Sequence, residues 1–437
     1  MLTQDVAFPT DDLATAGRLS GDPLKVASPG PTRRVRLMSQ ETGLAATSLL
    51  LAMLLAACSG SARPSAKGPE EPAAPQGLHG EPMFVTRIEG AIALDVTAGP
   101  EAPLVAWTTH DSVTAARLDL ASGELVDPST VSGDLVPVHH AIERPAVMAG
   151  RDGVIDVAFI SATDRGGTVY LSRDASVPEA ISGPARPETN LVHAVLDPEG
   201  SAVLAWLEDS SLSVAFGDGS LPVEAESVDD RTCDCCNPVP VFSGDTMLVA
   251  YRDLDEIGGE IVRNVVSTRS DDGRLDFEDP VTIADDDWLI DGCPFTGPDV
   301  AVVGDTLVVA WMDARQSRYP EQDGSSIWVD RSTDDGATFG EDLEIISGGF
   351  HRWPTMAVDD EGIVHLIWET EGPEGGLSYA WSADSGSTFS EPVLLLGRQI
   401  RDGGALRSPT ATFQAGAVVV SWADSRAGYV AAWPSGR

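Results

Sequence analysis

The chain has 437 residues, of which 42% are hydrophobic, and a formal net charge of -40 at pH 7. Binding to nucleic acid or to an anionic membrane surface depends on clustered basic residues, so this charge argues against both partners. The only lysines, Lys25 and Lys67, precede the part of the chain that we expect to fold, which excludes Schiff-base chemistry there.

The first recognisable element is an export signal. Three arginines at positions 33, 34 and 36 precede an apolar run over residues 43–57, which is too short for a confident membrane span. The run ends in Leu55-Ala56-Ala57-Cys58, which resembles the lipobox of bacterial lipoproteins. That resemblance implies cleavage before Cys58 and lipidation of its sulfur; the alternative is an ordinary signal peptide that happens to carry a cysteine.

The chain is therefore expected to have three parts. Residues 1–57 form the signal region, and residues 58–80 form the lipidated cysteine and a tether rich in Pro, Ala, Gly and Ser, which cannot bury enough surface to fold. Residues 81–437 form the folded domain. We expect a monomer in the bacterial cell envelope, outside the cytoplasm, anchored to a lipid bilayer through Cys58 at the outer membrane or cell surface.

Within residues 81–437, an apolar run ending in an aromatic residue recurs at intervals of 45 to 60 residues. A short apolar strand precedes each run and two more strands follow it, and four strands per repeat are typical of a β-propeller blade. We expect an all-β propeller with seven blades, or six as the alternative. The stretch "EPMFVTRI" (81–88) matches the fourth strand "EPVLLLG" (391–397), so the N-terminal strand is expected to close the C-terminal blade. The runs end at Trp107, Phe159, Trp206, Tyr251, Trp311, Trp368 and Trp422.

Two turns share the pattern S-x-D-x-G-x-T-F, at residues 332–339 and 382–389. They resemble the Asp-box, or BNR, repeats of the sialidase superfamily, whose characterised members have six blades. In such a turn the carboxylate accepts hydrogen bonds from turn amides, the glycine takes a positive φ and the aromatic ring fills the gap between sheets. The residues concerned are Asp334, Gly336, Phe339, Asp384, Gly386 and Phe389.

The loops that join consecutive blades should gather around one mouth of the central channel, and they hold the unusual side chains of this sequence. The resemblance to sialidases implies a substrate carboxylate held by three arginines and attacked by a tyrosine that a glutamate activates, and guanidinium groups suit a carboxylate. The family's Arg-Ile-Pro motif is matched only by Arg87-Ile88-Glu89, so the resemblance is incomplete. The candidate ligand-binding residues are Arg144, Tyr251, Arg252, Asp253, Trp288, Arg352, Trp353 and Arg407.

Four cysteines remain besides Cys58: three in the loop entering blade four and Cys293 in the loop entering blade five. Because consecutive loops are neighbours, we expect Cys233, Cys235, Cys236 and Cys293 to lie together as two disulfides, one of which joins Cys293 to a loop cysteine. With disulfides no cofactor is expected. The alternatives are a thiolate site for copper or zinc, with His351 or His140 as a further ligand, and a single catalytic thiol.

Two functions follow from these features. The first is a membrane-anchored, extracytoplasmic lipoprotein of sialidase-like form that binds a glycan, a peptide or a metal at the channel mouth. The alternative is a glycoside hydrolase of exo-α-sialidase type. A complete arginine triad beside a Tyr-Glu pair within hydrogen-bond reach would favour the enzyme, whereas cysteines and histidines crowding the mouth would favour binding. The sequence assigns no catalytic residue.

Overall fold

The computed structural model describes residues 77–436, apart from 139–141, 151–152, 164–165, 184–188, 218–224, 272–275, 285, 291–292, 316 and 398–405. The expected signal region, the lipobox with Cys58 and most of the expected tether lie outside the described residues. In the part of the chain that is described, no helix is long and apolar enough to cross a bilayer.

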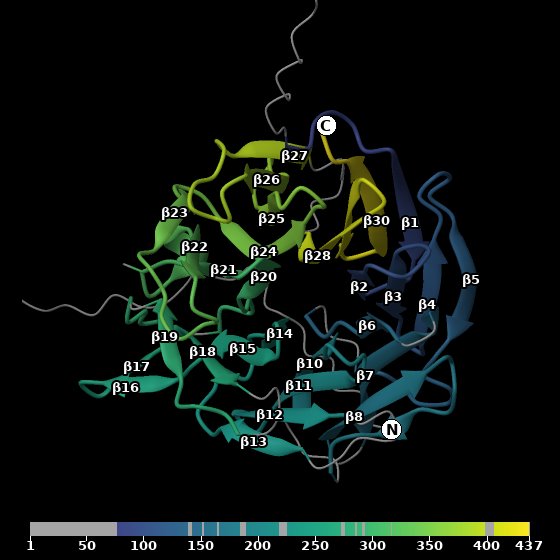
Figure 1. The fold of residues 1–437 in the computed structure, drawn as a ribbon, viewed down its shortest axis with the longest axis horizontal. Helices are drawn as coiled ribbons and strands as arrows, with labels where there is room; N and C mark the ends of the chain where they lie inside the picture. The colour runs from purple at the N-terminus through teal and green to yellow at the C-terminus, as the bar shows by residue number, and fades with distance from the viewer. Residues whose placement is uncertain are drawn as a thin grey trace, which may run out of the picture. The chain divides into compact units, whose positions relative to one another are not determined.

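Seven four-stranded antiparallel sheets surround a central channel (Figure 1). The chain is a seven-bladed β-propeller, as the repeat predicts, and the six-bladed alternative is wrong. Blade one is β2 (Ala93–Thr97), β3 (Leu104–Thr108), β4 (Val113–Leu118) and β5 (Leu125–Thr130). Blade two is β6 (Ala146–Ala149), β7 (Ile155–Thr163), β8 (Gly166–Arg173) and β9 (Glu179–Ala180). Blade three is β10 (Thr189–Leu196), β11 (Ala202–Glu208), β12 (Ser211–Phe216) and β13 (Glu226–Asp229).

The remaining blades keep the same order, and the first strand of each faces the channel (Figure 1). Blade four is β14 (Val239–Ser243), β15 (Thr246–Arg252), β18 (Val265–Ser270) and β19 (Val281–Ala284). Blade five is β20 (Asp299–Val303), β21 (Thr306–Asp313), β22 (Ser326–Ser332) and β23 (Leu343–Ile346), with the one-turn helix α1 (Pro320–Asp323) before β22. Blade six is β24 (His351–Val358), β25 (Val364–Thr370), β26 (Gly376–Ser382) and β27 (Val393–Gly397). Blade seven starts with β28 (Arg407–Gln414), β29 (Ala417–Ala423) and β30 (Ala427–Pro434).

The N-terminal strand completes blade seven. β1 (Phe84–Glu89) pairs antiparallel with β30 along its whole length, with Phe84 opposite Ala432 and Glu89 opposite Ala427. The predicted closure is confirmed, and it covers an edge that β30 would otherwise leave unpaired. Packing begins before the expected domain boundary: Leu78, assigned to the tether, is buried, and its N–H donates to the Tyr379 hydroxyl over 2.9 Å.

The aromatic residue near the end of each second strand is part of the core, with at most 8% of its surface exposed in all seven blades. Two of these indoles donate to a carboxylate two residues further on: Trp206 to Glu208 over 3.1 Å and Trp311 to Asp313 over 2.8 Å. Core clusters also join neighbouring blades, for example Leu248 of β15 with residues of β21. The repeated aromatic is therefore a packing device that ties each blade to the next.

The two S-x-D-x-G-x-T-F turns have the predicted geometry. In the first, Asp334 accepts hydrogen bonds from the N–H and the hydroxyl of Thr338, over 2.9 and 2.7 Å, and Gly336 has a φ of 82°. A side chain at Gly336 would collide with Leu248 of the preceding blade, which explains the glycine. Phe339 packs on the core shared with that blade. The second turn, at Asp384, Gly386 and Phe389, repeats these hydrogen bonds and contacts.

Besides the one-turn helix α1, one hairpin has no counterpart in the predicted repeat. β16 (Asp255–Ile257) and β17 (Glu260–Val262) form a separate hairpin between the second and third strands of blade four, visible as a projection at the rim (Figure 1). Gly258 and Gly259 have φ values of 65° and 88°, the conformation that a two-residue hairpin turn requires. This insertion accounts for the longest spacing in the repeat, between Tyr251 and Trp311.

Candidate functional site at the channel mouth

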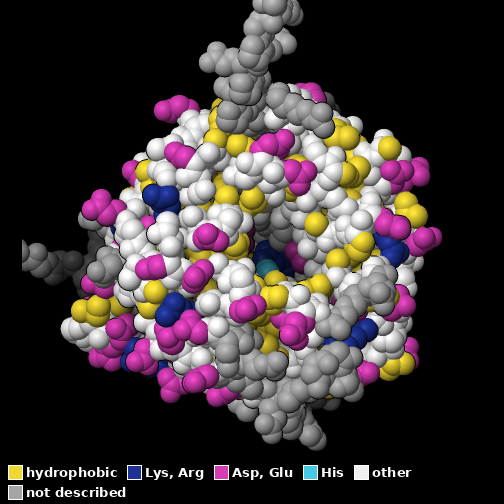
Figure 2. All heavy atoms as spheres, viewed as in Figure 1, with side chains coloured by type: hydrophobic (Ala, Val, Ile, Leu, Met, Phe, Trp, Pro, Cys, Tyr) yellow, Lys and Arg dark blue, Asp and Glu magenta, His cyan; other side chains and the backbone are white. Residues whose placement is uncertain are grey.

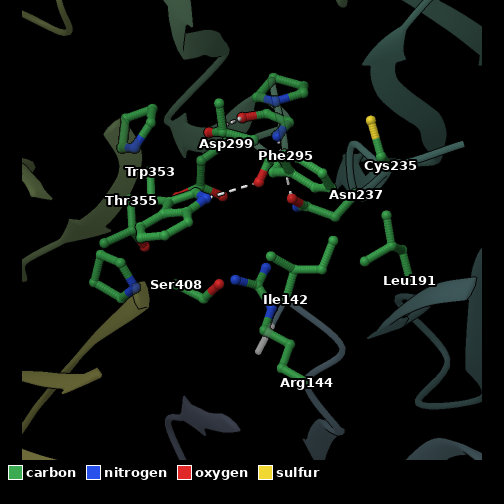
Figure 3. Close-up of a pocket in the computed structure, with 15 residues that line it drawn as sticks. Ile142, Arg144, Leu191, Cys235, Asn237, Phe295, Asp299, Trp353, Thr355 and Ser408 are labelled. Carbon is green, nitrogen blue, oxygen red and sulfur yellow. Dashed lines mark hydrogen bonds between the residues drawn. The ribbon is translucent and has the colours of Figure 1, made fainter. Parts of the chain in front are cut away.

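In five blades a proline lies at or near the start of the first strand, and the residue before each proline reaches the channel. These five residues come from blades two, four, five, six and seven, and all of them line one depression at the channel mouth, which we call the mouth pocket (Figure 3). The X-Pro pair recurs at the same position in these five blades, so the residue before each proline falls at the same place around the channel. The five are Arg144, Asn237, Gly297, Trp353 and Ser408.

The backbone around the mouth pocket is unusual. Leu191, Phe295, Trp353 and Ser408 line it with φ values of 57°, 56°, 48° and 44°. Leu191, Trp353 and Ser408 each lie where the register between the first two strands of their blade shifts. Such bulges redirect side chains, and a left-handed non-glycine residue costs about 1–3 kcal/mol. The local chain conformation thus turns these side chains into the channel, at a cost in stability.

Aromatic and amide groups form one side of the pocket. The Trp353 indole N–H donates to the Phe295 carbonyl oxygen over 2.7 Å, which fixes the half-buried indole beside an exposed phenyl ring (Figure 3). The Asn237 side-chain oxygen accepts from the Gly297 N–H over 3.3 Å, so its amide nitrogen is left to donate elsewhere. A side chain at position 297 would collide with the Asn237 backbone carbonyl, which explains why the pocket residue before Pro298 is a glycine.

Arg144 supplies the positive charge of the pocket. It is half-buried, and no described residue forms a hydrogen bond or an ion pair with its guanidinium. Burial lowers the pKa of nearby His193 to about 3, assisted by the Arg144 charge, so this histidine is neutral at pH 7. Burial raises the pKa values of Asp95 and Asp299 against the opposing effect of Arg144. Figure 2 shows basic, histidine and acidic atoms together inside the central hollow, on a face whose rim also carries scattered acidic side chains.

The mouth pocket is small. The space within it that a water-sized molecule can enter is about 20 Å³, which is room for roughly one water. A single small polar group, such as a carboxylate, would have to displace that water or open the pocket slightly. The rest of any ligand would lie across the open mouth, against Trp353 and Phe295.

Two of the eight predicted binding residues, Arg144 and Trp353, line the mouth pocket. The expectation that Tyr251, Arg252 and Trp288 lie at the mouth is wrong, because all three are at most 1% exposed. The Tyr251 hydroxyl donates to Asp229, and burial raises its pKa well above the usual range. The guanidinium of Arg252 donates to two backbone carbonyls over 2.9 and 2.7 Å and lies 5.2 Å from the centre of the Trp288 ring.

The other three predicted residues lie near the mouth but not in the pocket. The Asp253 carboxylate accepts from the Leu254 N–H, and burial raises its pKa to about 6. Arg352 pairs with Glu371 over 3.3 Å, and Arg407 precedes the pocket residue Ser408 on β28. Only Arg144 among the predicted arginines therefore lines the pocket, and the three-arginine cluster that the sialidase resemblance implies is not assembled there. Arg87, the partial match to the Arg-Ile-Pro motif, lies on the outermost strand of blade seven.

Sequence reasoning missed five polar pocket residues, which are Asn237, Thr296, Asp299, Thr355 and Ser408. The signal that could have found two of them is the X-Pro pair itself. Arg352 and Arg407 lie two residues before their prolines, one position too early, and the residue directly before each proline is the one that faces the channel. Asp299 follows its proline and accepts a hydrogen bond from the Met356 N–H of the next blade, which fixes its side chain along the channel wall.

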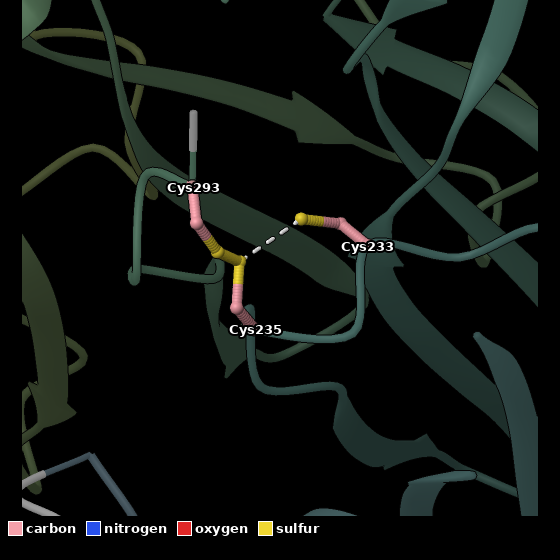
Figure 4. A group of neighbouring side chains, drawn as sticks. All are labelled: Cys233, Cys235 and Cys293. Atoms are coloured by element: carbon pink, nitrogen blue, oxygen red, sulfur yellow. Dashed lines mark hydrogen bonds between the residues drawn. A yellow bond between two sulfur atoms is a disulfide. The ribbon is translucent and has the colours of Figure 1, made fainter. Parts of the chain in front are cut away.

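The four cysteines meet beside the pocket. Cys235 and Cys293 form a disulfide, which confirms the expected bridge from Cys293 to the loop of blade four (Figure 4). The expected second bridge is not formed: Cys233 and Cys236 are buried thiols with their sulfurs 3.3 Å apart. The Cys233 sulfur is also 3.4 Å from the Cys235 sulfur. Cys235 itself lines the mouth pocket.

Three of the four cysteine sulfurs are close enough together to share a metal ion. The sulfurs of Cys233, Cys235 and Cys293 lie within 4.8 Å of one another. Soft metals bind thiolates, and two of these sulfurs are joined in a disulfide, so this oxidation state does not suit copper or zinc. The expectation that His351 joins the group is wrong, since its Nδ1 lies 3.1 Å from the Thr370 hydroxyl and accepts from the Trp368 indole within blade six. His140 lies outside the described residues.

No protein-family model and no curated protein matches this chain. Among solved structures, an ulvan lyase of a polysaccharide lyase family, bound to a saccharide of GlcA and sulfated rhamnose, is 13% identical over 83% of this chain and 96% of its own, with a TM-score of 0.53. The β-propeller domain of Myceliophteria thermophila Cps50 is 12% identical over 81% of this chain and 100% of its own, with a TM-score of 0.48. The Aleuria aurantia lectin, in complex with a fucosylated GlcNAc, is 13% identical over 67% of this chain and 96% of its own, with a TM-score of 0.41. At these identities the likeness shows the fold alone, and the resemblance to sialidases rests on the two turns.

Proposed function

We propose that this protein is a lipid-anchored, extracytoplasmic binding protein whose channel mouth recognises a glycan that carries a carboxylate. The observation that carries the proposal is the Arg144 guanidinium, which lies in the mouth pocket without a hydrogen-bond or ion-pair partner among the described residues. An arginine in a concave site whose guanidinium forms no hydrogen bond or ion pair with a described residue suits a ligand that brings a negative charge with it.

The surrounding groups suit a sugar. A guanidinium can hold a carboxylate through two parallel hydrogen bonds, and the Asn237 amide and Ser408 hydroxyl can bond to sugar hydroxyl groups. Trp353 and Phe295 offer flat apolar surface where the remainder of a saccharide would rest. The pocket takes only one small group, so a terminal or side carboxylate would enter it while the chain of sugars lies across the mouth.

The electrostatics support an anionic ligand in spite of the acidic surface. Arg144 is surrounded by low-dielectric channel walls, where a single charge acts over a longer range than on an open surface. His193 stays neutral at pH 7, and burial raises the pKa values of Asp95 and Asp299 while the Arg144 charge lowers them. The ulvan lyase that shares the fold is bound to a saccharide with GlcA units, so the fold can carry a ligand of this kind.

The location of the protein is the second part of the proposal. The lipobox-like sequence before Cys58 and the Pro-rich stretch after it support a lipid anchor followed by a tether. A disulfide in the folded domain suits an oxidising compartment outside the cytoplasm. A tethered propeller on a cell surface could capture acidic polysaccharide from the medium.

The proposal is tested by measuring binding to paired oligosaccharides that differ only in whether a uronic or sialic acid carboxylate is present or reduced to an alcohol. We expect binding of the acidic members, and a loss of about tenfold or more on Arg144→Gln, since hydrogen bonds to a charged group contribute about 1.5–3 kcal/mol. Trp353→Ala should weaken binding of acidic and reduced members alike.

The matched control is Arg352→Gln, which removes a cation next to the pocket residue Trp353 that is already paired with Glu371. It should bind as the wild type does. Equal binding of the acidic and reduced saccharides, or equal losses from Arg144→Gln and Arg352→Gln, would contradict the proposed role of Arg144.

A further inference from the structure

Three contacts link the four sulfurs of the cysteine group. The Cys236 sulfur lies 3.3 Å from that of Cys233. The Cys233 sulfur lies 3.4 Å from that of Cys235, and Cys235 is bonded to Cys293 (Figure 4). A thiol in contact with one sulfur of a disulfide is in the arrangement from which thiol–disulfide exchange starts, with reacting atoms about 3–3.5 Å apart. The group thus holds one disulfide and, next to it, one dithiol.

We propose that the buried Cys233–Cys236 dithiol exchanges with the Cys235–Cys293 disulfide, so that the channel mouth carries a redox-active relay toward an external dithiol or disulfide. This inference is independent of the proposed glycan ligand.

The first step is an attack within the loop. The Cys233 thiolate forms a bond to the Cys235 sulfur, the bond between Cys235 and Cys293 breaks, and the Cys293 sulfur leaves with the electron pair and takes up a proton. In the second step the Cys236 thiolate attacks the Cys233 sulfur and releases Cys235 as a thiol. The net change moves the disulfide from the outer pair, Cys235 and Cys293, to the inner pair, Cys233 and Cys236. Two thiols and one disulfide are present both before and after the exchange, so no external oxidant is needed.

The environments of the two inner thiols suit these roles. Hydrogen bonding with Cys236, followed by the charges of Arg252 and Arg263, lowers the pKa of Cys233 to about 7 against the effect of burial. Burial raises the pKa of Cys236. Cys233 is therefore the thiol with the larger thiolate fraction, and Cys236, three residues on in a C-x-x-C spacing, is placed to resolve the intermediate. The role of the buried Arg252, whose Nε has no hydrogen-bond partner among the described residues, is then to stabilise a thiolate rather than to bind ligand at the mouth.

Access differs between the two pairs. Cys233 and Cys236 are 2% and 1% exposed, whereas Cys235 and Cys293 are only half-buried and Cys235 lines the mouth pocket. An external thiol can reach the outer disulfide but not the inner dithiol. Electrons that enter at Cys235 or Cys293 can pass inward, and electrons stored in the inner pair can pass outward, so the relay couples a protected dithiol to the surface.

The test uses the full-length protein, purified in detergent and equilibrated in glutathione buffers from strongly reducing to strongly oxidising. Samples are quenched with acid, alkylated and digested with trypsin. No basic residue lies between Arg231 and Arg252, so the three loop cysteines stay on one peptide and Cys293 is on another. We expect a fraction of one-disulfide protein in which Cys293 is alkylated and the loop peptide holds an internal bridge.

Two variants separate the steps. In one-disulfide Cys236→Ser protein, Cys293 should still be alkylated, with a bridge between Cys233 and Cys235. In Cys233→Ser, Cys293 should stay joined to Cys235 and should not be alkylated. Both variants keep Cys235 and Cys293, which can still form their disulfide, and thermal unfolding checks that the variants are folded. The inference is overturned if Cys293 is never alkylated in one-disulfide wild-type protein, or if thiols appear only after chelation together with about one equivalent of zinc or copper.

Discussion

Asp334 shows how one side chain holds a turn of the propeller. Its carboxylate accepts hydrogen bonds from the Thr338 hydroxyl, the Ser332 hydroxyl and the Thr338 N–H, and these hydrogen bonds lower its pKa below the usual value. The turn places Phe339 against the core shared with blade four, so a hydrogen-bonding detail at the surface is connected to packing between blades. The same arrangement recurs fifty residues later at Asp384.

Replacing Asp334 with Asn should make stability less sensitive to acid. Because the folded-state pKa is depressed, the charged carboxylate stabilises the protein above the unfolded-state pKa near 3.8, and this contribution is lost as pH falls through the folded-state value. We expect the wild type to lose about 1 kcal/mol more than Asp334→Asn between pH 6 and pH 3. Urea unfolding at both pH values measures this; Asp111→Asn, at an exposed carboxylate with no such turn, is the control, and an equal effect of both variants would contradict the argument.

Arginines mark the limit of prediction at the residue scale. The topology predicts that Arg144 and Arg252 both lie near the mouth. In the structure Arg144 lines the pocket, whereas Arg252 is buried. Arg252 is held by the carbonyls of Arg263 and Met312, which come from two different blades, and no local pattern reveals such a contact. The position directly before each proline, in contrast, is visible in the sequence and identifies pocket residues that the charge pattern alone did not.

At the scale of elements, the repeat is strong evidence because strand period, turn residues and core aromatics all agree. The blade count and the pairing of β1 with β30 could therefore be predicted. The β16–β17 hairpin could not, because an insertion in one loop alters a single spacing and leaves the repeat intact. The left-handed residues that shape the pocket were also beyond prediction, since their bulges arise where the first strand of a blade leaves its regular register.

The closing strand offers a matched pair of substitutions. Ile88 is 7% exposed and packs in the core between blades seven and one, whereas Val85, on the same strand, is 47% exposed. We expect Ile88→Ala to lower the free energy of unfolding by about 2 kcal/mol and Val85→Ala to change it by less than about 0.5 kcal/mol. Chemical unfolding followed by tryptophan fluorescence measures both. Similar small effects would show that β1 is not part of the stabilising closure.

At the scale of the whole molecule, the chain combines an acidic propeller with a lipobox-like sequence before Cys58. The high negative charge disfavours contact between the propeller surface and anionic lipid, so the proposed attachment to a membrane would come from a lipid on Cys58. A tether of flexible composition would leave the mouth free to face the medium.

Cys58→Ser should therefore release the protein from membranes as a soluble species. Fractionation of cells that express the wild type and the variant, followed by detection of the protein in membrane and soluble fractions, measures this. If the variant still sediments with membranes through an uncleaved apolar segment, the lipoprotein hypothesis is wrong. An acidic ligand captured by the released variant would separate binding from anchoring.

The most direct test of the account is the energetic coupling between Arg144 and a ligand carboxylate. Calorimetry would give four affinities: wild type and Arg144→Gln, each with an acidic oligosaccharide and with its carboxyl-reduced counterpart. We predict that Arg144→Gln weakens binding of the acidic saccharide by about 1.5–3 kcal/mol more than binding of the reduced one. A coupling indistinguishable from zero would mean that the guanidinium in the mouth pocket does not hold a carboxylate, and would contradict the proposed function.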